Sequence, residues 1–252
     1  HRGNLHVMYD TVKLFDEMGV DEVRIIRTTE TPRWRENGGD ATLGILEYYG
    51  EMLKLVDALL QSGCKIRVDV WQFLHYDPAA LTYSYHPAQV QCSRYKGSIP
   101  ACKGARGTVA ISYNGEIYPC NQTSGTFASM GISFGNVKQS TLQELLTSGD
   151  YLGKVTLPVE QVRAENPACQ SCQYWNCCMG GCRAISLAFT KNYNHLDPSK
   201  CAFFKGGWMG EIDRVFAAAP GTYRCLSETG SMDKSGEPEN MGKVVARLGS
   251  YA

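Results

Sequence analysis

The sequence predicts a mixed fold, with an α/β segment over residues 1–78 followed by a loop-rich α+β segment over residues 79–212. Strand and helix patterns alternate before residue 78, whereas Tyr, Pro, Ser and Gly become frequent after it and helical periodicity fades. Cysteines at fixed gaps mark the second segment. We expect residues 213–252 to hold the end of a C-terminal helix and a mobile tail, because residues 228–242 are rich in small and polar residues.

The first segment reads as helix, strand, helix, strand. A helix is expected over 5–18, ended by Gly19, and a strand over 22–27. A second helix is expected over 41–61, and a second strand over 64–70. This order at this spacing predicts parallel α/β units. Two strands do not form a stable sheet of this kind alone, so they are interpreted as the last part of a larger barrel or open sheet.

The second segment contains a predicted β-hairpin and a cysteine-bearing helix. Strands over 109–112 and 116–118 flank Asn114-Gly115, for which we expect a turn with positive φ at both residues. A capping box starting at Ser140 predicts a short helix to about Ser148. A further helix is expected over 178–193, with Ile185 and Phe189 facing inward.

Composition excludes several classes of function. The chain has 252 residues, 43% of them hydrophobic, and a formal net charge of zero, so electrostatics favour neither a nucleic-acid partner nor an anionic membrane. The sequence has no basic-then-apolar signal segment and no apolar run of membrane-spanning length. It begins with His1 rather than Met, and we expect it to be a piece of a longer protein.

The cysteines carry the chemistry. Cys102 is followed by Gly115 after an x12 gap and by Cys120 after a further x4 gap, and the pattern then continues as Cys169-x2-Cys172-x5-Cys178-x3-Cys182 and Cys201. Eleven cysteines, an odd number in a long chain, disfavour a secreted disulfide scaffold and favour a reducing cytoplasm. Thiolates at this density bind zinc or iron–sulfur clusters, and seven or eight ligands indicate two centres. On one helix Cys178 and Cys182 would sit a turn apart and could serve the same metal.

This pattern resembles the SPASM domain, the C-terminal extension of many radical SAM enzymes that modify peptides and proteins. The resemblance covers about residues 92–205 and includes the segments 111–120, Gly135-Asn136-Val137 and 178–183. It implies that residues 1–78 are the last βα units of a partial (β/α)6 barrel, and that residues 79–212 bind two auxiliary [4Fe–4S] clusters. A third [4Fe–4S] cluster and S-adenosylmethionine belong to the complete enzyme only.

The resemblance also implies which cysteines bind which cluster. The first would take Cys102, Cys120 and Cys182, with Cys92 the natural fourth ligand and Cys177 its rival, unless one iron stays open for a substrate thiolate. The second cluster would take Cys169, Cys172, Cys178 and Cys201. Cys64 and Cys225 lie outside the pattern and are interpreted as ordinary thiols.

Two departures limit what the resemblance implies. The C-x3-C-x2-C motif that holds the SAM-binding cluster is absent, so this chain alone is not expected to cleave SAM, and the radical SAM half would act in cis or in trans. Asn121 follows Cys120 where sulfatase-maturing relatives have an acidic general base. Because an amide does not take up a proton at useful pH, thioether or carbon–carbon crosslinking of a ribosomal peptide fits better than formylglycine formation.

Other polar residues have a functional and an ordinary interpretation. Four arginines could line a peptide or SAM-carboxylate site at the strand ends, or be solvated: Arg24, Arg27, Arg33 and Arg35. Three histidines could be ligands, but the cysteines suffice: His75, His86 and His195. Four tyrosines could form a peptide-binding wall or pack in a core: Tyr76, Tyr83, Tyr85 and Tyr95. Asp69 could be a general base, on residue type alone.

Three functions compete at this point. The first is the C-terminal part of a radical SAM maturase, a cytoplasmic oxidoreductase with a peptide or protein substrate. The second is a structural zinc module, since Cys169-x2-Cys172 alone would suit a zinc ribbon. The third is a standalone iron–sulfur electron carrier, against which the two βα units argue.

Overall fold

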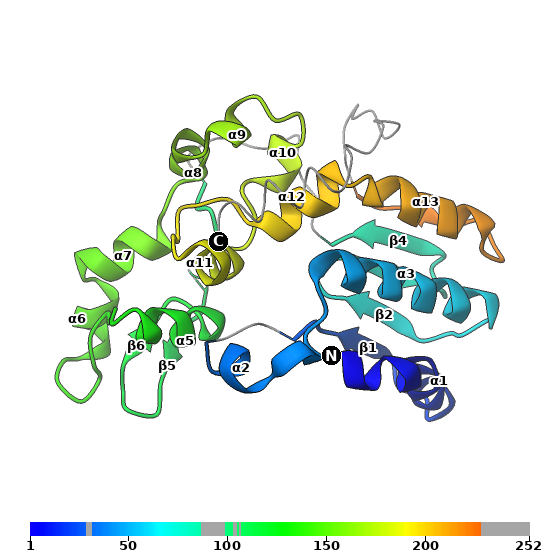
Figure 1. Ribbon diagram of the computed structural model, residues 1–252, viewed down its shortest axis with the longest axis horizontal. Helices are drawn as coiled ribbons and strands as arrows, with labels where there is room; N and C mark the ends of the chain where they lie inside the picture. Colours follow the sequence, from blue (N-terminus) through cyan, green and yellow to red (C-terminus); the bar gives the residue numbers. More distant parts are fainter. Residues whose placement is uncertain (29–31, 87–98, 103–104, 106, 228–252) are drawn as a thin grey trace.

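The computed structural model describes residues 1–28, 32–86, 99–102, 105 and 107–227. These residues form a mixed α/β structure with a five-stranded sheet, a two-stranded hairpin and many helices. Figure 1 shows the sheet on one side of the molecule and the hairpin with helices α5 to α11 on the other. The predicted combination of α/β and helical elements is confirmed at this level.

The five-stranded sheet has the order β1-β2-β3-β4-β7. Strands β1 and β2 are parallel, as predicted, and helix α3 connects them. The next two pairings are antiparallel, and β4 pairs with β7 in parallel. The strands are β1 (Glu22–Ile25), β2 (Arg67–Val70), β3 (Leu74–Asp77), β4 (Thr82–Tyr85) and β7 (Arg224–Cys225).

The helices of the first segment cover this sheet because their apolar residues recur on one face. Helix α3 (Ile45–Gln61) buries Tyr49, Val56 and Leu60 on one face, while Leu46 and Leu53 on that face are half-buried. The predicted first helix is divided into a 3-10 turn η1 (Arg2–Val7) and α1 (Met8–Glu17), of which Val12 is buried. Two short elements lie between β1 and α3, namely α2 (Pro32–Asn37) and η2 (Gly39–Ala41).

The sheet continues beyond residue 78, where we expected the segment to end. Residue 78 lies in the connection between β3 and β4, which form an antiparallel hairpin. Both strands alternate between buried and half-buried residues, and Tyr76 and Tyr85 point into the core with almost no exposure. The aromatic alternation is that of a strand with one buried face, which explains why these residues belong to the sheet.

The end of the described chain returns to the same sheet. Helix α12 (Pro198–Lys205) contacts α3, α10, α11 and α13, and α13 (Trp208–Ala218) packs on α3. The first core is the buried cluster formed by the sheet, α1, α3, α12 and α13. It includes Cys178 and the α12 residues Phe203 and Phe204, so the cysteine-bearing helices are fixed directly against the sheet.

A second core lies under the remaining elements and contains Tyr118, Phe127, Trp175, Leu187 and Tyr193. Its elements are β5 (Ala110–Ile111), β6 (Ile117–Tyr118), α5 (Asn121–Ser129), α6 (Leu142–Leu146), α7 (Gly149–Val155), α8 (Val159–Glu165), α9 (Pro167–Gln170), α10 (Trp175–Cys178) and α11 (Arg183–Thr190). The short helices explain the weak periodicity of this part of the sequence.

The predicted hairpin is present, but its turn differs from the prediction. Strands β5 and β6 are antiparallel, and the Gly115 amide donates to the carbonyl of Ser112. Gly115 has φ +93°, whereas Asn114 is not among the residues with positive φ. This is the geometry of a type I turn followed by a left-handed glycine, the usual solution for a three-residue loop.

The capping box is displaced by one residue. The Thr141 side chain caps α6, and the Glu144 carboxylate accepts a hydrogen bond from the Thr141 amide. Ser148, where the predicted helix ends, is the N-cap of the next helix, α7.

No helix in the described ranges is both long enough and apolar enough to cross a membrane. The expected tail at 228–242 lies outside the described residues.

Candidate metal centre

Among the seven motif cysteines, Cys178 belongs to the first core and Cys169 to the second, and Cys102 and Cys201 pack against the second core. All seven are free thiols. Cys120 is the N-cap of α5, Cys178 ends α10, Cys182 is the N-cap of α11 and Cys201 lies in α12. Cys169 lies in α9, Cys172 follows it by three residues, and Cys102 lies before the hairpin.

The segment between Cys178 and Cys182 is not helical, so the helix predicted over 178–193 is wrong at its start. Met179, Gly180 and Gly181 have φ values of +49°, +75° and +81°. Three left-handed residues in succession end α10 and reverse the chain before α11 begins. The two thiols therefore leave from different helices. Ile185 is buried in α11 as predicted, but so are all residues from Arg183 to Ala188, whereas Phe189, also predicted to face inward, is only half-buried.

Asp197 holds this reversal against the start of α12. Its side chain is almost completely buried, and one carboxylate oxygen accepts the Cys182 amide at 2.9 Å. The other oxygen accepts the amides of Ser199 and Lys200, which caps the helix that carries Cys201. One carboxylate thus links the backbones of two cysteine-bearing elements. Its position before Pro198 is a typical N-cap signal, which could have been read from the sequence.

Four thiols influence one another around α9, α10 and α12. Burial raises the pKa of Cys201 well above its usual value, and the thiolates of Cys178 and Cys169 add to that effect. Burial likewise raises the pKa of Cys169 to about 11, with Cys172 as the next cause. For Cys178, burial raises the pKa to about 12. We call Cys169, Cys172, Cys178 and Cys201 the α12 thiol set.

Three further thiols act electrostatically on Tyr193. Burial raises the pKa of Cys182 to about 11, and Cys102 contributes to the rise. Burial also raises the pKa of the Tyr193 hydroxyl, and the thiolates of Cys102, Cys120 and Cys182 act in the same direction. We call Cys102, Cys120 and Cys182 the Tyr193 thiol set.

The described residues contain no group of three or more His, Cys, Asp or Glu side chains that could hold a metal ion. An iron–sulfur cluster does not require three side chains to converge on one metal ion, because each thiolate of a [4Fe–4S] cluster binds a different iron. The donor chemistry of both thiol sets therefore fits iron–sulfur ligation.

Residues 102–177 match the family model of SPASM, described as an iron-sulfur cluster-binding domain. The chain contains a SPASM domain. No curated protein matches the sequence.

The match shows that this part of the chain belongs to a domain type that binds iron–sulfur clusters. Within the matched residues of the SPASM domain are Cys102, Cys120, Cys169 and Cys172. Cys178, Cys182 and Cys201 follow the matched range, and Cys182 and Cys201 interact electrostatically with Cys102 and Cys169 inside it. The SPASM domain recognised from the cysteine pattern is therefore confirmed, over a shorter range than the expected 92–205.

The remaining four cysteines belong to neither thiol set. Cys177 is buried in the first core, next to Cys178 in sequence. Cys64 is buried in the first core and Cys225 packs against it, in keeping with their interpretation as ordinary thiols. Cys92 lies outside the described residues, and so does Tyr95.

Asp69 is a charged residue of the sheet with two cationic or potentially cationic neighbours. Arg24 donates through Nε to one carboxylate oxygen at 2.6 Å, and His86 Nδ1 lies 3.3 Å from the other. Burial acts to raise the pKa of Asp69, but His86 and Arg24 outweigh it and leave the pKa below its usual value. A carboxylate held in its charged form in this way is a weak proton acceptor.

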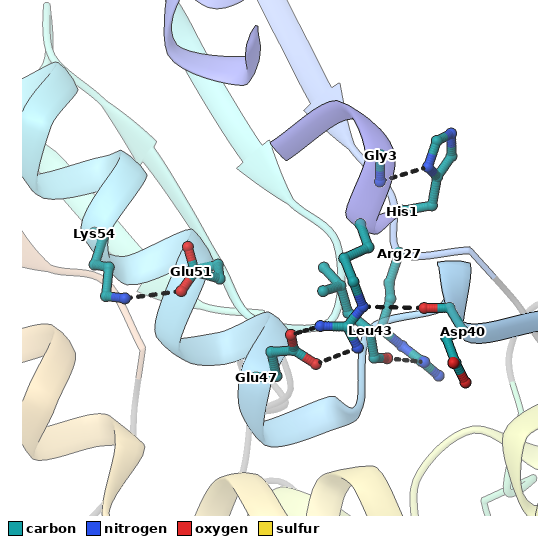
Figure 2. A network of polar contacts seen from close by, with 9 residues as sticks. His1, Gly3, Arg27, Asp40, Leu43, Glu47, Glu51 and Lys54 are labelled. Atoms are coloured by element: carbon teal, nitrogen blue, oxygen red, sulfur yellow. Dashed lines mark hydrogen bonds and ion pairs between the residues drawn. The ribbon is translucent and has the colours of Figure 1, made fainter. Parts of the chain in front are cut away.

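Of the four arginines expected at the strand ends, the structure describes the side chains of Arg24 and Arg27. Arg24 and Arg27 both line a cavity of about 260 Å³ beside β1. Figure 2 shows Arg27 donating to the backbone oxygen of Leu43, at 2.9 Å. The side chains of Arg33 and Arg35 lie outside the described part of the structure.

The histidines and tyrosines are dispersed over the fold. His75 lies in β3 of the sheet, and His195 lies in the loop before α12. Tyr76, Tyr83 and Tyr85 are buried in the first core, where aromatic packing accounts for them. Tyr83 stacks on Phe216 of α13, with ring centroids 4.1 Å apart.

Proposed function

We propose that the chain binds two auxiliary [4Fe–4S] clusters and forms the C-terminal part of a radical SAM enzyme that modifies a peptide or protein. The observation that carries this proposal is the match of residues 102–177 to the SPASM domain, and the seven free cysteines within and directly after it support the division into two ligand sets. When bound, such clusters transfer single electrons, and an iron with an open position binds a substrate thiolate.

The α12 thiol set would hold one cluster with four thiolates. Its members come from three short helices and the turn after α9, and two of them are buried. The α12 helix itself packs on α3 and α13 of the first core. The sheet and this cluster would thus share one rigid support, which fixes the cluster relative to any chemistry at the strand ends.

The Tyr193 thiol set supplies three thiolates to the other cluster. We propose Cys92 as the fourth ligand, because four thiolates normally complete such a cluster. The free thiols and the Asp197 bond to the Cys182 amide support a site that is fixed by the backbone rather than by flexible side chains.

The five-stranded sheet supports the second part of the proposal. Its parallel pair β1 and β2 with the connecting helix α3 has the form of a βα unit from a barrel, and we propose that it is the end of a partial (β/α)6 barrel. The sequence lacks the C-x3-C-x2-C motif. SAM cleavage would therefore depend on a radical SAM half in cis or in trans, in the cytoplasm.

Asn121 favours crosslinking of a ribosomal peptide over formylglycine formation. It is exposed at the first position of α5, immediately after Cys120, and its amide does not accept a proton. The test is to incubate the complete enzyme with a sulfatase peptide and with a cysteine-containing precursor peptide. Formylglycine in the sulfatase peptide would refute this assignment.

Metal analysis tests the cluster proposal itself. Anaerobically purified chain should be brown and contain about eight iron and eight sulfide per chain. Zinc in place of iron would instead identify a structural zinc module.

A further inference from the structure

Arg183 follows Cys182 directly and is the largest of the fully buried side chains, with 1% of its surface exposed. Among the described residues, its guanidinium nitrogens donate only to backbone oxygens. Nη1 donates to His195 at 2.6 Å and to Tyr193 at 3.1 Å, Nη2 donates to Gly180 and Gly181, and Nε donates to Gly181 at 3.4 Å. These carbonyls belong to the chain reversal before Cys182 and to the loop that leads to α12.

The positive charge of Arg183 has no ion-pair partner among the described residues. Asp197 is the carboxylate that acts on it most, but its oxygens accept N–H groups of Cys182, Ser199 and Lys200. A buried cation that is bonded only to neutral carbonyls is costly unless negative charge lies nearby.

Two motif cysteines flank the backbone segment that Arg183 holds, Cys178 before it and Cys182 after it. Cys178 belongs to the α12 thiol set and Cys182 to the Tyr193 thiol set, so Arg183 holds the short segment that joins the ligands of the two proposed clusters. A cluster bound by thiolates carries net negative charge, and net charge is one of the factors that set its reduction potential.

We infer that Arg183 is a positioning residue and the buried counter-charge of the two proposed clusters. The inference rests on the proposed function. The five-donor guanidinium fork holds the Gly180-Gly181 reversal, which sends Cys178 and Cys182 to different thiol sets. Its charge stabilises the clusters, and it stabilises their reduced forms most because reduction adds negative charge.

The test compares Arg183→Lys with Arg183→Gln in the anaerobically purified full chain, reconstituted with iron and sulfide. Both substitutions remove the fork, but only the lysine keeps the charge. Arg214→Gln serves as a control, because Arg214 lies on α13 with its side chain 71% exposed. The readouts are iron and sulfide per chain and the midpoint potentials, followed by electron paramagnetic resonance.

Arg183→Gln is expected to shift the reduction equilibrium of the cluster bound by Cys182 at least tenfold toward the oxidised form, about 59 mV for one electron. Arg183→Lys should stay within about twofold of the wild type, and Arg214→Gln should not differ from it. If a variant loses iron, the lysine variant should retain more than the glutamine variant.

Equal potentials and equal iron content for the lysine and glutamine variants, in a chain whose wild type carries both clusters, would overturn this inference alone. A wild type that takes up no iron would overturn the proposed function as well.

Discussion

Replacing Gly181 by alanine probes the chain reversal that separates the two thiol sets. Gly181 has φ +81°, and a Cβ added there would lie 2.3 Å from Cβ of Asp197 and 2.7 Å from its Oδ2. Asp197 has little freedom to retreat, because its carboxylate is bonded to the backbone on both sides. Glycine is therefore required at this position for its φ and for its lack of a side chain.

The loss in free energy of unfolding can be estimated from the backbone strain and the steric overlap at this position. A left-handed backbone costs a residue with a Cβ about 1–2 kcal/mol, and overpacking a closed site costs about 1–3 kcal/mol. Gly181→Ala should therefore lower the free energy of unfolding by about 2–5 kcal/mol. It should also displace the Cys182 amide, so that iron falls from about eight toward about four per chain.

The assay is urea unfolding of the variant and the wild type, together with iron analysis. Gly153→Ala is the matched control, because Gly153 lies inside α7 and an added Cβ would meet nothing within 4 Å. That control should be stabilised by about 0.5–1 kcal/mol. The reasoning is refuted if Gly181→Ala unfolds like the wild type and keeps all of its iron.

Two further predictions concern the thiols and the sheet. Cys172→Ser should remove about half of the iron, because one cluster loses a ligand. The control Cys225→Ser should keep all of the iron. Equal iron content in the two variants would contradict the proposed ligand sets. Asp69 has a lowered pKa in the folded state, so its stabilising contribution is complete above its unfolded value of about 3.9 and is lost as pH falls through the folded value. Asp69→Asn should therefore flatten the acid side of the stability–pH curve measured by denaturant unfolding, and an unchanged curve would show that these contacts do not stabilise the fold.

The first part of the fold could be predicted because its periodicity is strong. The inner stripe of α3 and the parallel pair β1 and β2 follow from apolar spacing, and Gly19 and Gly63 adopt the positive φ of helix ends. Strands β3 and β4 were missed because tyrosines near Pro and Ser were interpreted as loop. Strand β7 has two residues and pairs with a strand about 140 positions earlier, so local sequence carries no signal for it.

In the candidate site, the cysteines were predictable and their surroundings were not. Gap lengths indicated ligand pairs, but the left-handed conformation of Met179 depends on contacts that a sequence does not display. The same holds for Arg183, because a single arginine in a sequence is more often exposed than buried. The predicted helix over 178–193 failed for this reason, and with it the option that Cys178 and Cys182 serve one metal from one helix.

Iron and acid-labile sulfide, counted in the anaerobically purified and reconstituted chain, test the central claim most directly. The two thiol sets predict about eight of each per chain, with the absorption and paramagnetic resonance of four-iron clusters. Stoichiometric zinc without sulfide, or cysteines recovered as cystines, would contradict it.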